Sequence, residues 1–145
     1  MDKKFIFTTT LIWAGDKRGK LFCPNKPQIE ISTPPEFRGP VGYWSPEDLF
    51  LASINSCIMT TFIYFAEKLF LVFLSYKSEI EGEVTFEEGK LAFSSVTVRP
   101  VIEVKSGTDK EKAKQAIEKS EKHCLISSSV KPKITLLPKI KLKAD

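Results

Sequence analysis

The sequence predicts an α+β fold in which antiparallel β-sheet is wrapped around a long central helix. Two observations indicate this class: an apolar stretch with helix-start signals lies over 45–68, and β-prone segments flank it on both sides. With 145 residues, of which 42% are hydrophobic, the chain has the size and apolar content of one globular domain. We therefore expect a single domain over 1–145.

The N-terminal part is expected to form a β-hairpin region over 1–31. Short β-prone segments, the first over 4–13, are separated by polar turns at 15–19 and 24–27. The following stretch, 32–44, is rich in proline and glycine. Because proline lacks an N–H and restricts its predecessor, this stretch predicts a constrained loop.

The central helix is expected over 45–68. Ser45 is a suitable N-cap, Pro46 fits the first helical position, and Glu47 with Asp48 suits the positive end of the helix dipole. The body is apolar on nearly all sides, which is typical of a helix buried in a fold or spanning a membrane. Polar side chains within it favour the buried helix, and two subunits would cover such a helix more easily than one.

The C-terminal part is expected to contain a β-meander over 76–105, with separate strands at 90–95 and 96–104. A capping-box pattern then predicts a second helix over 108–124. Lysines alternating with aliphatic residues predict a charged edge strand over 133–142, interrupted by a proline. The apolar stripe of the second helix comprises Ala113, Ala116, Ile117, Ser120 and Cys124.

Charge and cysteine content indicate the cellular location and the classes of partner. The net charge of +4 arises from lysines dispersed among acidic residues, which argues against a dedicated nucleic-acid partner. Three cysteines are too few for a disulfide framework, and the N-terminus lacks the apolar stretch of a secretory leader. We therefore expect a cytoplasmic, reducing location, with neither nucleic acid nor membrane as a partner.

Two cysteines are candidates for chemistry. Cys57 lies within the central helix and Cys124 on the inward stripe of the second, so they could form a redox pair or be buried packing residues. Cys57 is too far from its helix N-terminus for the dipole to act, so we expect a reactive thiolate there to need a cation from elsewhere. The dipole at the end of the second helix would raise the pKa of Cys124, which suits a resolving thiol. His123 is expected to face solvent.

No bound metal or cofactor is expected. Cys23, Cys57, His123 and Cys124 could provide four metal ligands in number, but their spacing pre-organises no two of them. The sequence also has no phosphate loop, nucleophile elbow or dinucleotide fingerprint. Cys23 is expected to play no part in the chemistry.

The segments around these cysteines resemble the superfamily of osmotically inducible protein C and organic hydroperoxide resistance proteins (OsmC/Ohr). SPEDLFLASINSC at 45–57 is similar to the family pattern N/S-P-E-x-L-x-x-A-x-x-x-C, and STPPEFRGPVGYW precedes it at 32–44. KHCLISSSV at 122–130 resembles the segment of the second cysteine, with Leu125 where the family usually has proline. The resemblance implies an intertwined homodimer with sheets wrapped around long central helices and an active site at each subunit interface.

The resemblance also implies an activity, that of a cysteine-based peroxidase reducing small organic hydroperoxides in oxidative or osmotic stress defence. Cys57 would be the peroxidatic cysteine and Cys124 the resolving one, with an external dithiol reductant, in the family often lipoyl-linked. Glu47 matches the family glutamate, and either Arg18 or Arg38 would match its arginine. Ten helical residues separate Glu47 from Cys57, roughly 15 Å. An arginine bridging them is therefore easier to build if Glu47 comes from the partner subunit.

Two alternative interpretations stay open. In one, the protein is a non-catalytic dimer that binds an apolar or acyl ligand in the interface pocket. In the other, the central helix anchors the chain in a membrane. In the peroxidase interpretation, the side chains expected to line the apolar pocket are Phe50, Ile54, Phe62 and Phe65.

Overall fold

The computed structural model describes residues 3–143. Residues 1, 2, 144 and 145, at the ends of the expected domain over 1–145 and of the expected hairpin region over 1–31, lie outside the described residues. The chain folds as two compact units, an N-terminal unit (Met1–Phe50) and a C-terminal unit (Leu51–Asp145). Sheets and helices occur together, so the α+β class is confirmed.

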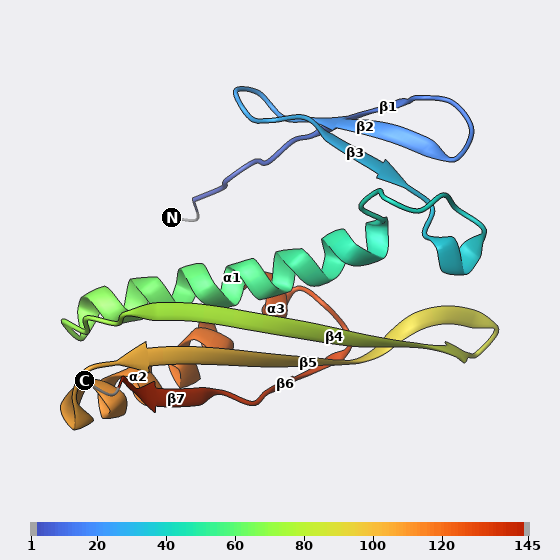
Figure 1. Ribbon diagram of the computed structural model, residues 1–145. Coiled ribbons are helices and arrows are strands. Elements are labelled where there is room, and N and C mark those ends of the chain that lie inside the picture. The colour runs from blue at the N-terminus through green and yellow to red at the C-terminus, as the bar shows by residue number, and fades with distance from the viewer. Residues whose placement is uncertain (1–2, 144–145) are drawn as a thin grey trace. The chain divides into compact units, whose positions relative to one another are not determined.

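The N-terminal unit contains a three-stranded antiparallel sheet (Figure 1). Its strands, in the order β1-β2-β3, are β1 (Thr10–Trp13), β2 (Arg18–Phe22) and β3 (Ile29–Ser32). The strand expected over 4–13 begins only at Thr10, whose partner is Phe22. Pro24, two residues further along, has no N–H with which to extend the ladder.

The constrained loop leads from this sheet into the central helix. It contains a short 3-10 helix, η1 (Pro35–Phe37), and returns to the sheet through a bridge between Ile31 and Trp44. Helix α1 (Pro46–Lys68) begins at the expected capping residues. The N–H of Asp48 donates to Ser45 Oγ at 3.1 Å, and the N–H of Ser45 donates to Asp48 Oδ2 at 3.0 Å. This reciprocal pair fixes the helix start.

Helix α1 provides part of the core of the C-terminal unit. Its fully or almost fully buried residues recur every four positions: Ile54, Ile58, Phe62 and Ala66. Among the described residues α1 is the one helix long and apolar enough to cross a membrane by length and composition, a test that core helices of soluble proteins also pass. The expected pocket role of Ile54 and Phe62 is wrong, since both side chains are completely buried.

The sheet of the C-terminal unit is built on one long strand. β4 (Ser75–Glu87) and β5 (Lys90–Val104) form an antiparallel hairpin through Glu88 and Gly89, whose φ angles of 49° and 80° fit the tight turn. The separate strands expected over 90–95 and 96–104 are one strand. A bulge at Ser94 of β5, opposite Glu83 and Val84 of β4, absorbs the change in alternation.

The other edge of β5 carries two short parallel strands. β6 (Lys133–Leu136) pairs with its middle and β7 (Lys139–Leu142) with its end. Pro138 lies between them, which divides the single edge strand expected over 133–142 into two.

Both helices of the C-terminal unit cover the same face of this sheet. Alternate residues of β5 are buried on that face: Val96, Val98, Pro100, Ile102 and Val104. Tyr76 pairs with Ile102 in the sheet and contacts Phe62 of α1. Helix α2 (Gly107–His123) packs its predicted stripe inward, so Cys124 at its end is completely buried. A short helix, α3 (Leu125–Ser128), follows at once.

Candidate functional site

The C-terminal unit brings Cys57 and Cys124 together. Cys57 lies on α1 and is half-buried, whereas Cys124 ends α2 and is 0% exposed. Their thiols are hydrogen-bonded to each other. Two cysteines that are 67 positions apart in the sequence are thus placed side by side, because both helices pack on one face of the sheet.

The surroundings of Cys57 favour its thiolate. Burial alone would raise the pKa of Cys57, but hydrogen bonds from Cys124, from the backbone of Ile126, from Thr61 and from the backbone of Leu125 together lower it. Thr61 Oγ1 lies 4.0 Å from the sulfur, one helical turn along α1. The backbone groups belong to the first turn of α3, where amide N–H groups have no partner within the helix.

No cation is among the causes that lower this pKa in the described residues. Hydrogen-bond donors within the same unit lower it. One of these donors can be seen in the sequence: Leu125 has a backbone N–H, which the proline usual at this position in the family lacks.

The pKa of Cys124 is shifted in the opposite direction, upwards. Burial and the adjacent Cys57 raise its pKa, while the N–H of Ser127, which donates to Cys124 Sγ at 3.4 Å, partly offsets them. The pair is therefore asymmetric. Cys57 is the thiol that ionises first, and Cys124 is held as a neutral neighbour that donates to it.

A groove opens beside Cys57. It has a volume of about 480 Å³ and is lined by Thr60, Thr61, Tyr64, Phe65 and His123. His123 is exposed, as expected, and its ring lies 5.4 Å from that of Phe65. Thr61 both lines this groove and contacts the Cys57 sulfur, so the groove adjoins the surroundings of the thiol.

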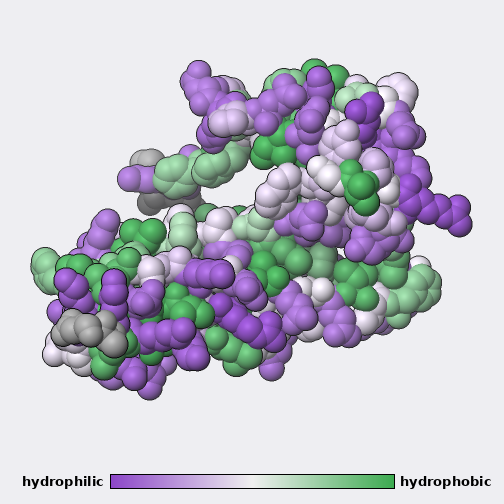
Figure 2. All heavy atoms as spheres, in the orientation of Figure 1, coloured by the Kyte–Doolittle hydropathy of each residue, from purple (hydrophilic) through white to green (hydrophobic). Residues whose placement is uncertain are grey.

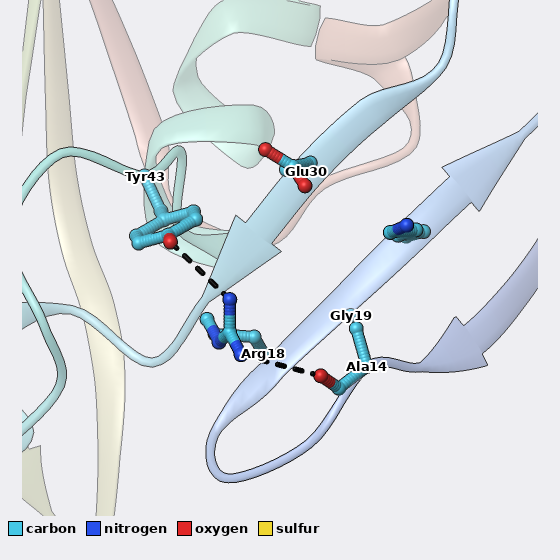
Figure 3. A pocket seen from close by; sticks show the side chains of 6 residues that line it. Ala14, Arg18, Gly19, Glu30 and Tyr43 are labelled. Atoms are coloured by element: carbon cyan, nitrogen blue, oxygen red, sulfur yellow. Dashed lines mark hydrogen bonds between the residues drawn. The ribbon is translucent and has the colours of Figure 1, made fainter.

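The two candidate arginines lie in the N-terminal unit. Arg18 donates from Nη1 to the hydroxyl of Tyr43 at 3.4 Å and from Nη2 to the carbonyl of Ala14 at 3.4 Å (Figure 3). Its guanidinium also lies 5.9 Å from the centre of the Tyr43 ring. These residues line a pocket of about 340 Å³ together with Gly19, Lys20 and Glu30.

Arg38 is exposed and caps η1 with a left-handed backbone, φ 70°. Its carbonyl accepts a hydrogen bond from Lys17 Nζ at 2.7 Å. Glu47 lies in the first turn of α1, and its Oε1 is buried with no hydrogen-bond partner among the described residues. The structure thus leaves one carboxylate oxygen of Glu47 without a donor.

The remaining residues singled out from the sequence have other surroundings. The third cysteine, Cys23, is half-buried in the N-terminal unit and donates weakly to the carbonyl of Thr8 at 3.7 Å. Across residues 3–143, no group of three or more histidine, cysteine or acidic side chains is placed to hold a metal ion.

Residues 39–137 match the family described as OsmC-like protein. The chain belongs to the OsmC-like family. The matched residues include Cys57 and Cys124 but not Arg18.

Several known proteins are similar to this one over most of the chain. The uncharacterized protein YmaD of Bacillus subtilis (strain 168) is 27% identical over 109 residues, which are 73% of each chain. An OsmC-like protein of unknown function from Vibrio cholerae has a TM-score of 0.83 at 20% identity, covering 93% of this chain and 99% of the other. An organic hydroperoxide resistance protein from Elizabethkingia anophelis has a TM-score of 0.76 at 18% identity, covering 99% and 100%. At these identities the solved structures establish the fold.

Proposed function

We propose that this OsmC-like protein is a thiol-dependent peroxidase that reduces small organic hydroperoxides. One observation carries the proposal, namely that Cys57 and Cys124 are hydrogen-bonded neighbours whose pKa values are shifted in opposite directions. A low-pKa thiol that is open to a groove has the properties of an attacking thiolate, and a buried thiol beside it those of a resolving one. The fold relationship to a protein named for organic hydroperoxide resistance supports the same class of substrate.

The proposed reaction has two steps on the enzyme. The Cys57 thiolate attacks the outer oxygen of the hydroperoxide, so an S–O bond forms, the O–O bond breaks and the alkoxide takes a proton to leave as alcohol. Cys124 then attacks the resulting sulfenic acid, which gives a Cys57–Cys124 disulfide and water. An external dithiol, lipoyl-linked or of another kind, supplies the two electrons that return the enzyme to its reduced form.

We further propose that the working unit is a homodimer. Large apolar side chains are exposed on both units, and Figure 2 shows apolar surface among hydrophilic side chains. Such exposure is typical of surfaces that are covered in an assembly. On the C-terminal unit the most exposed of these side chains are Phe70, Val72, Phe86 and Leu125.

In this dimer Glu47 and an arginine, Arg18 or Arg38, would complete the site of the partner subunit. The buried Glu47 oxygen without a donor supports this role, because a guanidinium would satisfy it. The arginine would then bridge this carboxylate and the Cys57 thiolate.

The activity is tested by mixing reduced protein with cumene hydroperoxide and titrating free thiols. We expect two thiols to be lost per chain and a Cys57–Cys124 disulfide to be found by peptide mass mapping. Cys57→Ser should abolish turnover, Cys124→Ser should stop at a sulfenic or over-oxidised Cys57, and Cys23→Ser is the matched control that keeps full activity. Unchanged thiols, particularly with an apolar or acyl ligand co-purifying, would instead favour a ligand-binding protein.

The shared site is tested by complementation. A mixture of Glu47→Gln and Cys57→Ser subunits, exchanged in mild denaturant, contains heterodimers with one site that holds both Glu47 and Cys57 if the two come from different subunits. We expect activity to reappear on mixing although each variant alone is inactive. Continued inactivity of the exchanged mixture would place both residues in the same subunit's site.

A further inference from the structure

The two sulfurs of the pair differ in access. Cys124 is 0% exposed, enclosed at the junction of α2 and α3, whereas Cys57 is half-buried. The groove lined by Thr60, Thr61 and Phe65 adjoins Cys57 at Thr61, whose hydroxyl lies 4.0 Å from the Cys57 sulfur. Of the two sulfurs, Cys57 is therefore the one that a thiol from solvent can reach.

We propose that the reductant attacks the Cys57 sulfur of the Cys57–Cys124 disulfide from this groove, and that Cys124 is the leaving thiolate. The inference rests on the proposed function, because this disulfide is its product. It assigns the groove beside Cys57 a second use, as the entry path of a thiol narrow enough to pass between Thr61 and the ring of Phe65.

The proposed reduction is a thiol–disulfide exchange in two steps. The reductant thiolate forms an S–S bond with Cys57, the Cys57–Cys124 bond breaks, and its electron pair goes to the Cys124 sulfur. That sulfur already accepts the N–H of Ser127 at 3.4 Å, which stabilises the charge until it takes a proton. The second thiol of the reductant then displaces the Cys57 thiolate, and the reductant leaves as its own disulfide.

The acidity of the two thiols alone would favour attack on Cys124, because Cys57 has the lower pKa and is the better leaving group. Brønsted slopes of about 0.4–0.5 make each pKa unit worth roughly a threefold change in rate. Access has the larger effect, since a sulfur with no exposed surface cannot be reached without opening α2 from α3. Once released, Cys124 takes a proton, because burial and the adjacent Cys57 raise its pKa, and this slows its return to Cys57.

The test uses the full chain carrying Cys23→Ser, so that only the pair can react. The Cys57–Cys124 disulfide is formed with diamide, which does not require peroxidase activity. One equivalent of 2-mercaptoethanol is added, the exchange is quenched with acid, and free thiols are blocked with N-ethylmaleimide before peptide mass mapping. We expect the mercaptoethanol adduct on Cys57 and the maleimide on Cys124, in about tenfold excess over the reverse pattern.

A smaller excess, or the adduct on Cys124, would overturn the inference. Since diamide supplies the disulfide, this result is independent of whether hydroperoxides oxidise the protein. Failure of cumene hydroperoxide to form the same disulfide would count against the proposed function alone.

A pair of variants tests the groove. His123→Trp places a larger ring against Phe65 and should slow reduction of the preformed disulfide several-fold. Lys114→Trp makes a similar change at an exposed position of the same helix and should leave the rate unchanged. Equal rates for the two variants would show that the thiol does not enter by the groove. Circular dichroism of both variants confirms that α2 is intact.

Discussion

The thiol of Cys124 is a hydrogen-bond donor to the sulfur of Cys57, and it is the largest of the contributions that lower the pKa of Cys57. A neutral, buried thiol thus stabilises the charge on its more exposed neighbour. The residue proposed to resolve the sulfenic acid also prepares the thiolate that forms it.

The first prediction separates these two roles of Cys124. Cys124→Ser keeps a donor beside Cys57, whereas Cys124→Ala removes it. We expect the pKa of Cys57 to rise in Cys124→Ala and to change less in Cys124→Ser, although neither variant can form the disulfide. The pH dependence of Cys57 alkylation by iodoacetamide, in a Cys23→Ser background, measures both. Equal pKa values in the two variants would show that the thiol of Cys124 is no donor.

The second prediction concerns the other hydrogen-bond donors to the Cys57 sulfur, which are Thr61 and the backbone of α3. Thr61→Val removes the hydroxyl, and Leu125→Pro removes a backbone N–H while proline remains acceptable at the first helical position. Both changes should raise the pKa of Cys57, Thr61→Val by more, because the hydroxyl contributes more than the Leu125 N–H. The alkylation rate below the pKa should fall accordingly in both. Leu125→Ala, which shortens the same side chain but keeps the backbone N–H, is expected to leave it unchanged.

The third prediction concerns the close contact between α1 and β4 at Gly82. A Cβ at this position would lie 2.7 Å from the Phe93 ring and 2.8 Å from Leu51 Cδ2. Gly82→Ala should therefore destabilise the fold by about 1–3 kcal/mol, as overpacking does.

The matched control for Gly82 is Gly107→Ala. Nothing lies within 4 Å of a Cβ at Gly107, at the start of α2, so this change should be neutral or stabilising by about 0.5–1 kcal/mol. Urea denaturation followed by circular dichroism gives both values. Equal stability of the two variants would contradict the tight packing of α1 on the sheet.

The fourth prediction concerns alkaline pH. Burial raises the pKa of Tyr76 to about 12, above the ordinary tyrosine value of 10.0. The folded state therefore binds this proton more tightly than the unfolded state, so its contribution is complete below pH 10 and is lost as pH rises towards 12. The loss is at most about 1.4 kcal/mol per pH unit, reduced by the partial exposure of the ring.

Tyr76→Phe should remove this part of the alkaline destabilisation. Tyr64→Phe, the same change at an exposed position of α1, should not. Thermal unfolding between pH 9 and 12 compares them, and the Tyr76 ring should be the last tyrosine to show phenolate absorbance. Parallel alkaline profiles for Tyr76→Phe and wild type would contradict the buried phenol.

Local signals predict the fold where they are strong. The start of α1 follows from Ser45, Pro46 and Asp48 because capping is decided by a few adjacent residues. The inward stripe of α2 follows from its period, and it correctly places Cys124 in the core. Strand ends were less predictable, since β1 begins only at Thr10, opposite the end of β2 at Phe22, two residues before Pro24.

The cysteine pair was predictable from the sequence, but the groups that shift its pKa values were not. The spacing from Glu47 to Cys57 and the segment around Cys124 pointed to the pair. Backbone donors from α3 could not be foreseen, because a four-residue helix has no periodic pattern of its own. Nor could the burial of Ile54 and Phe62, since a helix that is apolar all round does not reveal which face meets the sheet.

The long strand β5 has a consequence for the order in which this protein folds. It pairs with β4 through a two-residue turn, a local contact that closes quickly. The end of its other edge pairs with β7, where Lys139 is the partner of Val101. Helices α2 and α3 lie between these two residues in the sequence, so this pairing forms later. During synthesis the hairpin can form as soon as Val104 emerges, but the second edge of β5 stays open until β7 has been synthesised. Chains that stop before Lys139 would leave residues 101–104 of β5 unpaired on this edge and free to join the same strand of another copy.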